Sequence, residues 1–194
     1  MQRDTSNIIL EAATDSLRRK GFSGCGINEI LVAAGVPKGS FYHYFRSKEI
    51  LVEAVLKAYA KQVSDGWSVV LENPRIPPIE AIGIVLQDGR DALLGENFFG
   101  GCLLGTLAQE LGSQDASLVT MMQGMFRGWE SHFAGALQRA QACGDLSREI
   151  DVAALAGFVL NGWEGAVLRA KLDRSPTPLD QYLDHIARYL KLLG

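Results

Sequence analysis

The chain has 194 residues, of which 47% are hydrophobic and 21% are charged, and its formal net charge is −3. This balance is typical of a globular protein and excludes a largely disordered chain. The length allows one or two domains with a core that needs no disulfide or metal. No uncharged stretch approaches the ~20 residues that a membrane-spanning helix needs, and the N-terminus lacks an apolar signal core, so we expect neither a membrane span nor secretion.

Cysteine usage and motif content argue against secretion and against catalysis. The three cysteines lie far apart, at positions 25, 102 and 143, which favours a reducing cytoplasm over a disulfide framework. No C-x-x-C, H-E-x-x-H, G-x-S-x-G, P-loop or G-x-G-x-x-G pattern occurs. We therefore predict no enzyme activity, no cofactor and no metal site.

Charge is unevenly distributed along the chain. Residues 1–48 hold seven basic and four acidic side chains, a net charge of +3, which leaves −6 for the remainder. A basic first quarter is what local attraction to a polyanion requires, although ordinary surface variation could produce the same difference.

The first three predicted elements form a helix-turn-helix. A helix over 5–20 carries Ile9, Ala13 and Leu17 at four-residue spacing and ends at Gly21. A second helix covers 27–34, and Gly35-Val36-Pro37 ends it, because proline cannot continue a helix. A third covers 38–45. Two short helices joined by a glycine-containing turn are typical of this motif.

The third predicted helix has one apolar side and one polar side. Phe41 and Phe45 are four residues apart and are expected to point inward together. The opposite side then presents small and hydrogen-bonding residues, which suit the major groove of DNA. The alternative is that the aromatic residues of this helix all belong to a core.

A longer stretch carries a family resemblance. Residues 28–49, NEILVAAGVPKGSFYHYFRSKE, resemble the DNA-binding signature of the tetracycline-repressor (TetR) family, and the match extends over about 8–56. The resemblance implies an all-α fold, with a three-helix head and a ligand-binding body, and a homodimer that represses genes from a palindromic operator in double-stranded DNA. It implies base contacts from Lys38, Gly39, Ser40, Tyr42 and His43, and phosphate contacts from Tyr42, Tyr44 and Lys48. Many members carry a hydroxyl residue just before the second helix, whereas this chain has Cys25-Gly26.

The rest of the chain is predicted to be helical. A connecting helix over about 47–72 begins with Ser47 as N-cap, and a proline-rich loop follows at 73–78. Further helices are expected over 78–94, 99–111, 115–143, 150–171 and 178–193. We assign 1–48 to a DNA-binding domain and 49–194 to a ligand-binding and dimerisation domain.

Methionine and aromatic residues gather in the body. Their softness and shape suit a pocket for a small organic inducer, although an apolar helix face is equally compatible with plain core. The predicted ligand residues are Phe99, Cys102, Leu103, Thr106, Met122, Met125, Phe126, Trp129 and Trp163. Cys102 could be a thiol activated at a helix N-terminus or a small buried residue. The run Gly-Cys-Leu-Leu-Gly followed by Glu110 resembles a TetR branch that includes regulators answering electrophiles and acrylate-type acids.

The last two predicted helices carry apolar and small residues at helix-packing spacing. Two such helices from each chain could form a four-helix bundle across a twofold axis, or the same residues could face the chain's own core. The predicted interface residues are Phe158, Gly162, Gly165, Arg169, Leu183, Ile186 and Leu190.

The functional prediction is a DNA-binding repressor released from its operator by a small organic ligand or electrophile. One alternative is an architectural or division-site DNA-binding factor without ligand control. Another is an all-α enzyme that uses Glu110, Glu130 and His132 as acid–base groups.

Overall fold

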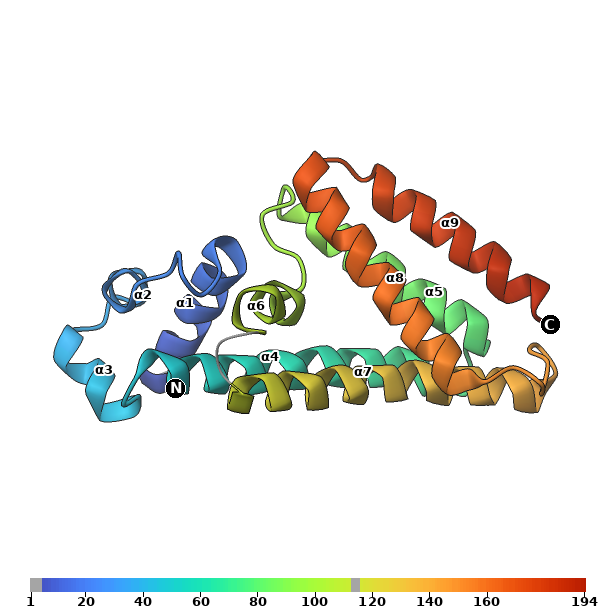
Figure 1. Ribbon diagram of the computed structural model, residues 1–194, viewed down its shortest axis with the longest axis horizontal. Helices are drawn as coiled ribbons and strands as arrows, with labels where there is room; N and C mark the ends of the chain where they lie inside the picture. Colours follow the sequence, from blue (N-terminus) through green and yellow to red (C-terminus); the bar gives the residue numbers. More distant parts are fainter. Residues whose placement is uncertain (1–4, 113–115) are drawn as a thin grey trace. The chain divides into compact units, whose positions relative to one another are not determined.

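The computed structural model describes residues 5–112 and 116–194, and the secondary structure of the described part consists of helices joined by loops, without a strand (Figure 1). The helices are α1 Thr5–Lys20, α2 Ile27–Ala34, α3 Lys38–Tyr44, α4 Lys48–Leu71, α5 Pro78–Gly95, α6 Leu103–Leu111, α7 Ala116–Cys143, α8 Val152–Asp173 and α9 Thr177–Leu192. The all-α prediction is confirmed. Residue 115, which was predicted to begin a helix, lies outside the described residues.

Helix ends follow local capping chemistry. Asp151 accepts hydrogen bonds from the backbone N–H groups of Ala153 and Ala154, so α8 begins two residues later than predicted. The hydroxyl of Ser47 accepts from the N–H of Ile50 at 3.3 Å, as expected for the start of α4.

The helix predicted over 99–111 begins at Leu103 instead. Asn97, Phe98 and Gly101 all have positive φ angles, of 51°, 63° and 101°. A backbone in this region cannot continue an α-helix. Helix α6 therefore starts only after Gly101, with Cys102 as its N-cap.

Contacts divide the chain into two compact units. The first is Met1–Gln62 with Cys102–Gln123, and the second is Val63–Gly101 with Gly124–Gly194. Thus α6 belongs to the same unit as α1, α2 and α3. The predicted boundary between residues 48 and 49 divides the chain by function, into DNA binding and ligand binding, and it stays a prediction.

The core of the first unit forms around α1. Ile9, Ala13 and Leu17 are completely buried, as their spacing predicted. Helix α1 packs against both α2 and α6. Four leucines of α6 are also buried, which gives this short helix one continuous apolar side: Leu103, Leu104, Leu107 and Leu111.

The second unit brings α5, α8 and α9 together, with α9 packed against both other helices (Figure 1). Glycines permit the closest approaches. A Cβ on Gly89 would lie 2.7 Å from Cζ2 of Trp163, and one on Gly162 would lie 2.6 Å from Cε2 of Tyr182. The Tyr182 hydroxyl donates to the Val159 carbonyl, and burial raises the pKa of this phenol well above its usual range.

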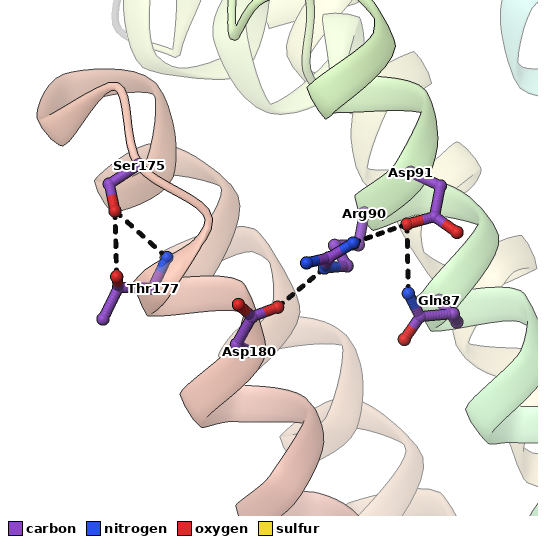
Figure 2. Close-up of polar contacts among 6 residues, drawn as sticks. All are labelled: Gln87, Arg90, Asp91, Ser175, Thr177 and Asp180. Carbon is purple, nitrogen blue, oxygen red and sulfur yellow. Dashed lines mark hydrogen bonds and ion pairs between the residues drawn. The ribbon is translucent and has the colours of Figure 1, made fainter.

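An ion-pair network joins α5 to α9 in the same unit. Figure 2 shows Arg90 between two carboxylates: its Nε lies 2.6 Å from Asp180 of α9, and its Nη1 lies 2.7 Å from Asp91. These carboxylates raise the pKa of Arg90 above its usual value, chiefly through the hydrogen bond with Asp180. The exposure of both carboxylates makes the network a minor contributor to stability.

Arg139 of α7 holds the C-terminal end of α4. Its guanidinium donates to the carbonyls of Leu71, Asn73 and Ile76, the last two at 3.1 and 3.0 Å. The last carbonyls of a helix lack partners within the helix, and a cation near them also complements the helix dipole. This contact fixes the start of the loop between α4 and α5.

Candidate nucleic-acid interface

The turn between α2 and α3 is built by Gly35 and Pro37. Gly35 adopts a φ of 64°, and its N–H donates to carbonyls near the end of α2. Pro37 precedes α3 with a φ of −60°, which suits a residue at a helix start. The sequence signals for this turn are confirmed, and α3 ends at Tyr44, one residue earlier than predicted, because Phe45 is extended with a φ of −133°.

Helix α3 turns its phenylalanines inward and its polar aromatics outward. Phe41 and Phe45 are 0% and 6% exposed, with ring centroids 5.9 Å apart. Tyr42 is 57% exposed, and His43 and Tyr44 are also exposed. The alternative in which all these aromatics form a core is wrong for this helix.

The beginning of α3 is open to a bound duplex. Lys38 and Gly39 are exposed and Ser40 is half-buried, and a Cβ added to Gly39 would meet nothing within 4 Å. Small residues here let the backbone approach a groove closely, while Lys38 supplies a positive charge.

Lys48, one of the three predicted phosphate contacts, begins α4 and is half-buried. Its ammonium donates to the carbonyl of Phe22 and lies 4.1 Å from the centroid of that ring. Because an ammonium has three donors, this bond leaves others that can reach a phosphate.

The departure from the family pattern before α2 has a structural consequence. Gly26 is the N-cap of α2 and provides no side-chain hydrogen bond. Cys25 is completely buried, and burial raises the pKa of its thiol above the usual value. Neither residue presents a hydroxyl to a phosphate.

The predicted ligand residues fall into both units, and each group is described by itself. In the first unit, Cys102 is half-buried and its sulfur accepts from the N–H of Gly105 at 3.2 Å, while Thr106 is also half-buried. Leu103 and Met122 are buried. Cys102 is therefore a helix N-cap, neither sealed in the core nor fully exposed.

In the second unit, Trp129 is buried between other aromatic rings. The Phe126 and Trp67 centroids lie 5.7 and 5.3 Å from it. Met125 and Phe126 are half-buried, and Trp163 is buried against Gly89. Phe99 is exposed beneath the guanidinium of Arg174, with 4.7 Å between them. A separate groove of about 910 Å³ between α5 and α9 is lined by none of the predicted ligand residues.

The predicted dimer residues differ in how much surface they leave free. Ile186 and Leu190 are 5% and 2% exposed, because α9 packs against α5 within the chain. Leu183 and Gly162 are half-buried. Phe158, Gly165 and Arg169 are exposed. Four further exposed apolar residues of α8 and α9 were missed by the sequence reasoning: Leu168, Leu172, Tyr189 and Leu192.

The sequence reasoning treated Glu110 as an acid–base candidate and as part of a run that resembles one branch of the family, and it gave the carboxylate no partner. In the structure its carboxylate accepts from the N–H groups of Phe22 and Ser23, 88 and 87 residues away. His132 belongs to the second unit, where its Nδ1 lies 3.6 Å from a carboxylate oxygen of Glu72. No local pattern could have paired Glu110 with a turn so distant in sequence.

The described residues, 5–112 and 116–194, contain no group of three or more His, Cys, Asp or Glu side chains placed to hold a metal ion. None of their helices has the length and apolar character needed to cross a bilayer.

Comparison with known proteins identifies both parts of the chain. Residues 9–55 match the model for bacterial regulatory proteins of the tetR family, and residues 78–186 match a tetracyclin repressor-like C-terminal domain. Transcriptional regulator AcuR of Cereibacter sphaeroides is 35% identical over 181 residues, which cover 93% of this chain and 83% of that protein. HTH-type transcriptional repressor DhaR of a Mycobacterium species is 32% identical over 90% of this chain and 86% of that protein.

Solved structures agree with the sequence matches. The regulatory protein TetR from Rhodobacter sphaeroides superposes with a TM-score of 0.90 at 35% identity, covering 94% of this chain and 96% of that one. The reduced form of Escherichia coli NemR gives a TM-score of 0.84 at 29% identity, over 95% of each chain. With its exposed recognition helix and matches along most of its length, this chain belongs to the TetR family of DNA-binding transcriptional regulators.

Proposed function

We propose that this regulator is a cytoplasmic homodimeric repressor, and that a small organic ligand or electrophile lowers its affinity for a palindromic operator. The observation that supports it most directly is the outward face of α3, where Tyr42 and His43 are exposed while Phe41 is buried. Family membership supports regulation of transcription in place of catalysis, so we propose no enzyme activity for it.

The proposed DNA contacts follow from the exposed side of the head. Bases are read by the start and outer face of α3, and phosphates are bound next to it. Base contacts come from Lys38, Gly39, Ser40, Tyr42 and His43, and phosphate contacts come from Tyr42, Tyr44 and Lys48.

A second copy of the chain would cover the exposed apolar residues of α8 and α9. Phe158 and Tyr189 contact one another with centroids 5.7 Å apart and are both exposed. An apolar surface of this kind favours burial in an interface. Two heads about 34 Å apart would then read successive major-groove faces of one operator.

For the ligand we propose that the methionine, aromatic and α6 residues predicted from the sequence contribute to binding. The half-buried N-cap Cys102 adds the option that an electrophile acts on its thiol. A tenfold loss of operator affinity requires only about 1.4 kcal/mol of preference of the ligand for the released state.

The DNA half of the proposal is tested with duplexes selected from a random library by the wild-type chain. Tyr42→Ala should raise the Kd about 5- to 150-fold, since one good base contact is worth about 1–3 kcal/mol. Lys57→Ala is the matched control, because Lys57 is an exposed cation of α4 paired with Glu53, away from the proposed contacts. Equal Kd values for wild type and Tyr42→Ala would refute the proposed reading face.

The ligand half is tested with acrylate and N-ethylmaleimide as probes and acetate as the control. Release of DNA by either probe supports ligand control. Release by N-ethylmaleimide that persists in Cys102→Ser excludes this thiol as the sensor. Binding that no probe alters, at many scattered genomic sites, favours the architectural or division-site factor instead.

A further inference from the structure

The turn that follows α1 is held from two sides. Its residues 21–23, here called the α1 turn, begin with Gly21 at a φ of 69°. The N–H of Gly21 still bonds the Leu17 carbonyl at 2.9 Å. The next two N–H groups have left the helix, so they need partners from elsewhere.

Glu110 of α6 supplies those partners. Its two carboxylate oxygens accept separately, Oε1 from the N–H of Phe22 at 3.0 Å and Oε2 from the N–H of Ser23 at 2.9 Å. Amide bonds to an ionised carboxylate are stronger than neutral ones. The fit depends on Gly21, because a Cβ there would lie 1.7 Å from Oε1.

Lys48 of α4 holds the same turn from its other side. It donates to the carbonyl of Phe22 and lies over the ring of that residue. Lys48 follows the end of α3 by only four residues. The α1 turn is therefore bonded to α6 through the N–H groups of Phe22 and Ser23, and to α4 through the carbonyl of Phe22. Helix α4 directly follows the recognition helix α3.

A second contact ties α6 to the same compact unit. The N–H of Leu103 donates to the Tyr59 hydroxyl of α4 at 3.4 Å, at the opposite end of α6 from Glu110. Helices α1 and α6 also pack against each other (Figure 1). Helix α6 is thus held at both of its ends within the unit that contains α1, α2 and α3.

We propose that Glu110 is a positioning residue whose carboxylate couples the position of α6 to the position of the α1 turn in the DNA-binding head. Through Glu110, a displacement of α6 is transmitted to the α1 turn and to Lys48, and DNA bound to the head in turn stabilises α6. This reciprocity is a thermodynamic requirement of any coupling between the two. The inference rests on the DNA-binding role proposed for the head.

Amide hydrogen exchange at single-residue resolution, with and without the selected duplex, tests this coupling. The full-length wild type is compared with Glu110→Ala, the isosteric Glu110→Gln and the neighbouring control Gln109→Ala, which alters an exposed residue of α6. The duplex Kd of each variant is measured in parallel. Glu110→Gln retains the size of the side chain and carries the test if Glu110→Ala does not fold.

In the wild type we expect DNA to slow exchange in α6, although no α6 residue is a proposed DNA contact. In Glu110→Ala, exchange at Phe22 and Ser23 should be about tenfold faster or more, and the effect of DNA on α6 should vanish. Glu110→Gln should be intermediate, because its amide NH₂ cannot accept a hydrogen bond. Gln109→Ala should match the wild type.

If the role of Glu110 were purely structural, Glu110→Ala would lower the protection of amides generally but leave the DNA-dependent slowing of exchange in α6 intact. That result would overturn the proposal. Unchanged exchange at Phe22 and Ser23 in Glu110→Ala would also overturn it. A wild-type chain that binds no duplex would defeat the DNA-binding role itself. These failures are distinguishable, because the wild-type Kd reports the DNA-binding role and the variants report the coupling.

Discussion

Alanine at Gly21 should destabilise the protein far more than alanine at Gly35, although both glycines have nearly the same backbone conformation. Their φ angles are 69° and 64°. A side chain in this left-handed region costs about 1 kcal/mol by itself. A Cβ on Gly35 meets nothing within 4 Å, so Gly35→Ala should show this cost alone.

At Gly21 the same conformational cost is joined by the loss of the Glu110 contact. The new Cβ would lie 1.7 Å from Oε1 and 2.7 Å from Cδ of Glu110, so the carboxylate must leave both N–H groups. Two amide–carboxylate hydrogen bonds at a partly solvated turn contribute about 2 kcal/mol together. Gly21→Ala should therefore cost about 3 kcal/mol against about 1 kcal/mol for Gly35→Ala.

Urea denaturation at one fixed protein concentration measures these differences, since the stability of the proposed dimer would depend on concentration. A double-mutant cycle isolates the contact: in a Glu110→Ala background, Gly21→Ala should cost only about 1 kcal/mol. Equal costs at Gly21 and Gly35 in the wild-type background would refute the reasoning. So would an undiminished cost of Gly21→Ala after Glu110 is removed.

Three further outcomes are expected from the same denaturation assay. Arg139→Met should cost about 2–3 kcal/mol by releasing three backbone carbonyls, and Arg139→Lys should recover less than half, because an ammonium lacks the planar fork; full recovery by lysine would contradict this. Gly89→Ala should destabilise by about 1–2 kcal/mol through overpacking, whereas Gly83→Ala, whose Cβ meets nothing, should stabilise by up to about 1 kcal/mol; the same sign for both would contradict the packing argument. Because burial raises the pKa of Cys25 in the folded chain above its usual 9.0, the unfolded chain loses this proton first, so stability should fall as the pH rises past that value and fall less in Cys25→Ala; parallel pH profiles would exclude this contribution.

Local chemistry made the head predictable. Gly35 and Pro37 end one helix and begin the next, and both act between neighbours in the chain. The four-residue spacing of Phe41 and Phe45 gave the inward side of α3 correctly, which placed Tyr42 outside. These features depend on periodicity and capping over a few residues, which a sequence displays directly.

Backbone geometry and exposure in the body were less predictable. The start of α6 was placed four residues too early, because Gly101 adopts a positive φ that interrupts any helix begun at residue 99, a conformation that glycine permits but does not require. The stripe of α9 was recognised, but only the structure decided that Ile186 and Leu190 pack within the chain. An apolar stripe predicts that a helix is covered, without saying by which partner.

The sequence by itself determined the helical fold, the helix-turn-helix and the chemistry of its outer face, because each follows from residues that are close together in the chain. Only the tertiary structure decided the partners of Glu110 and Arg139, whose hydrogen bonds span 88 and up to 68 residues. A charged side chain shows in the sequence that it needs a partner. Which backbone groups become its hydrogen-bond partners is decided only when helices that are distant in the sequence pack together, since hydrogen bonds form only at short range.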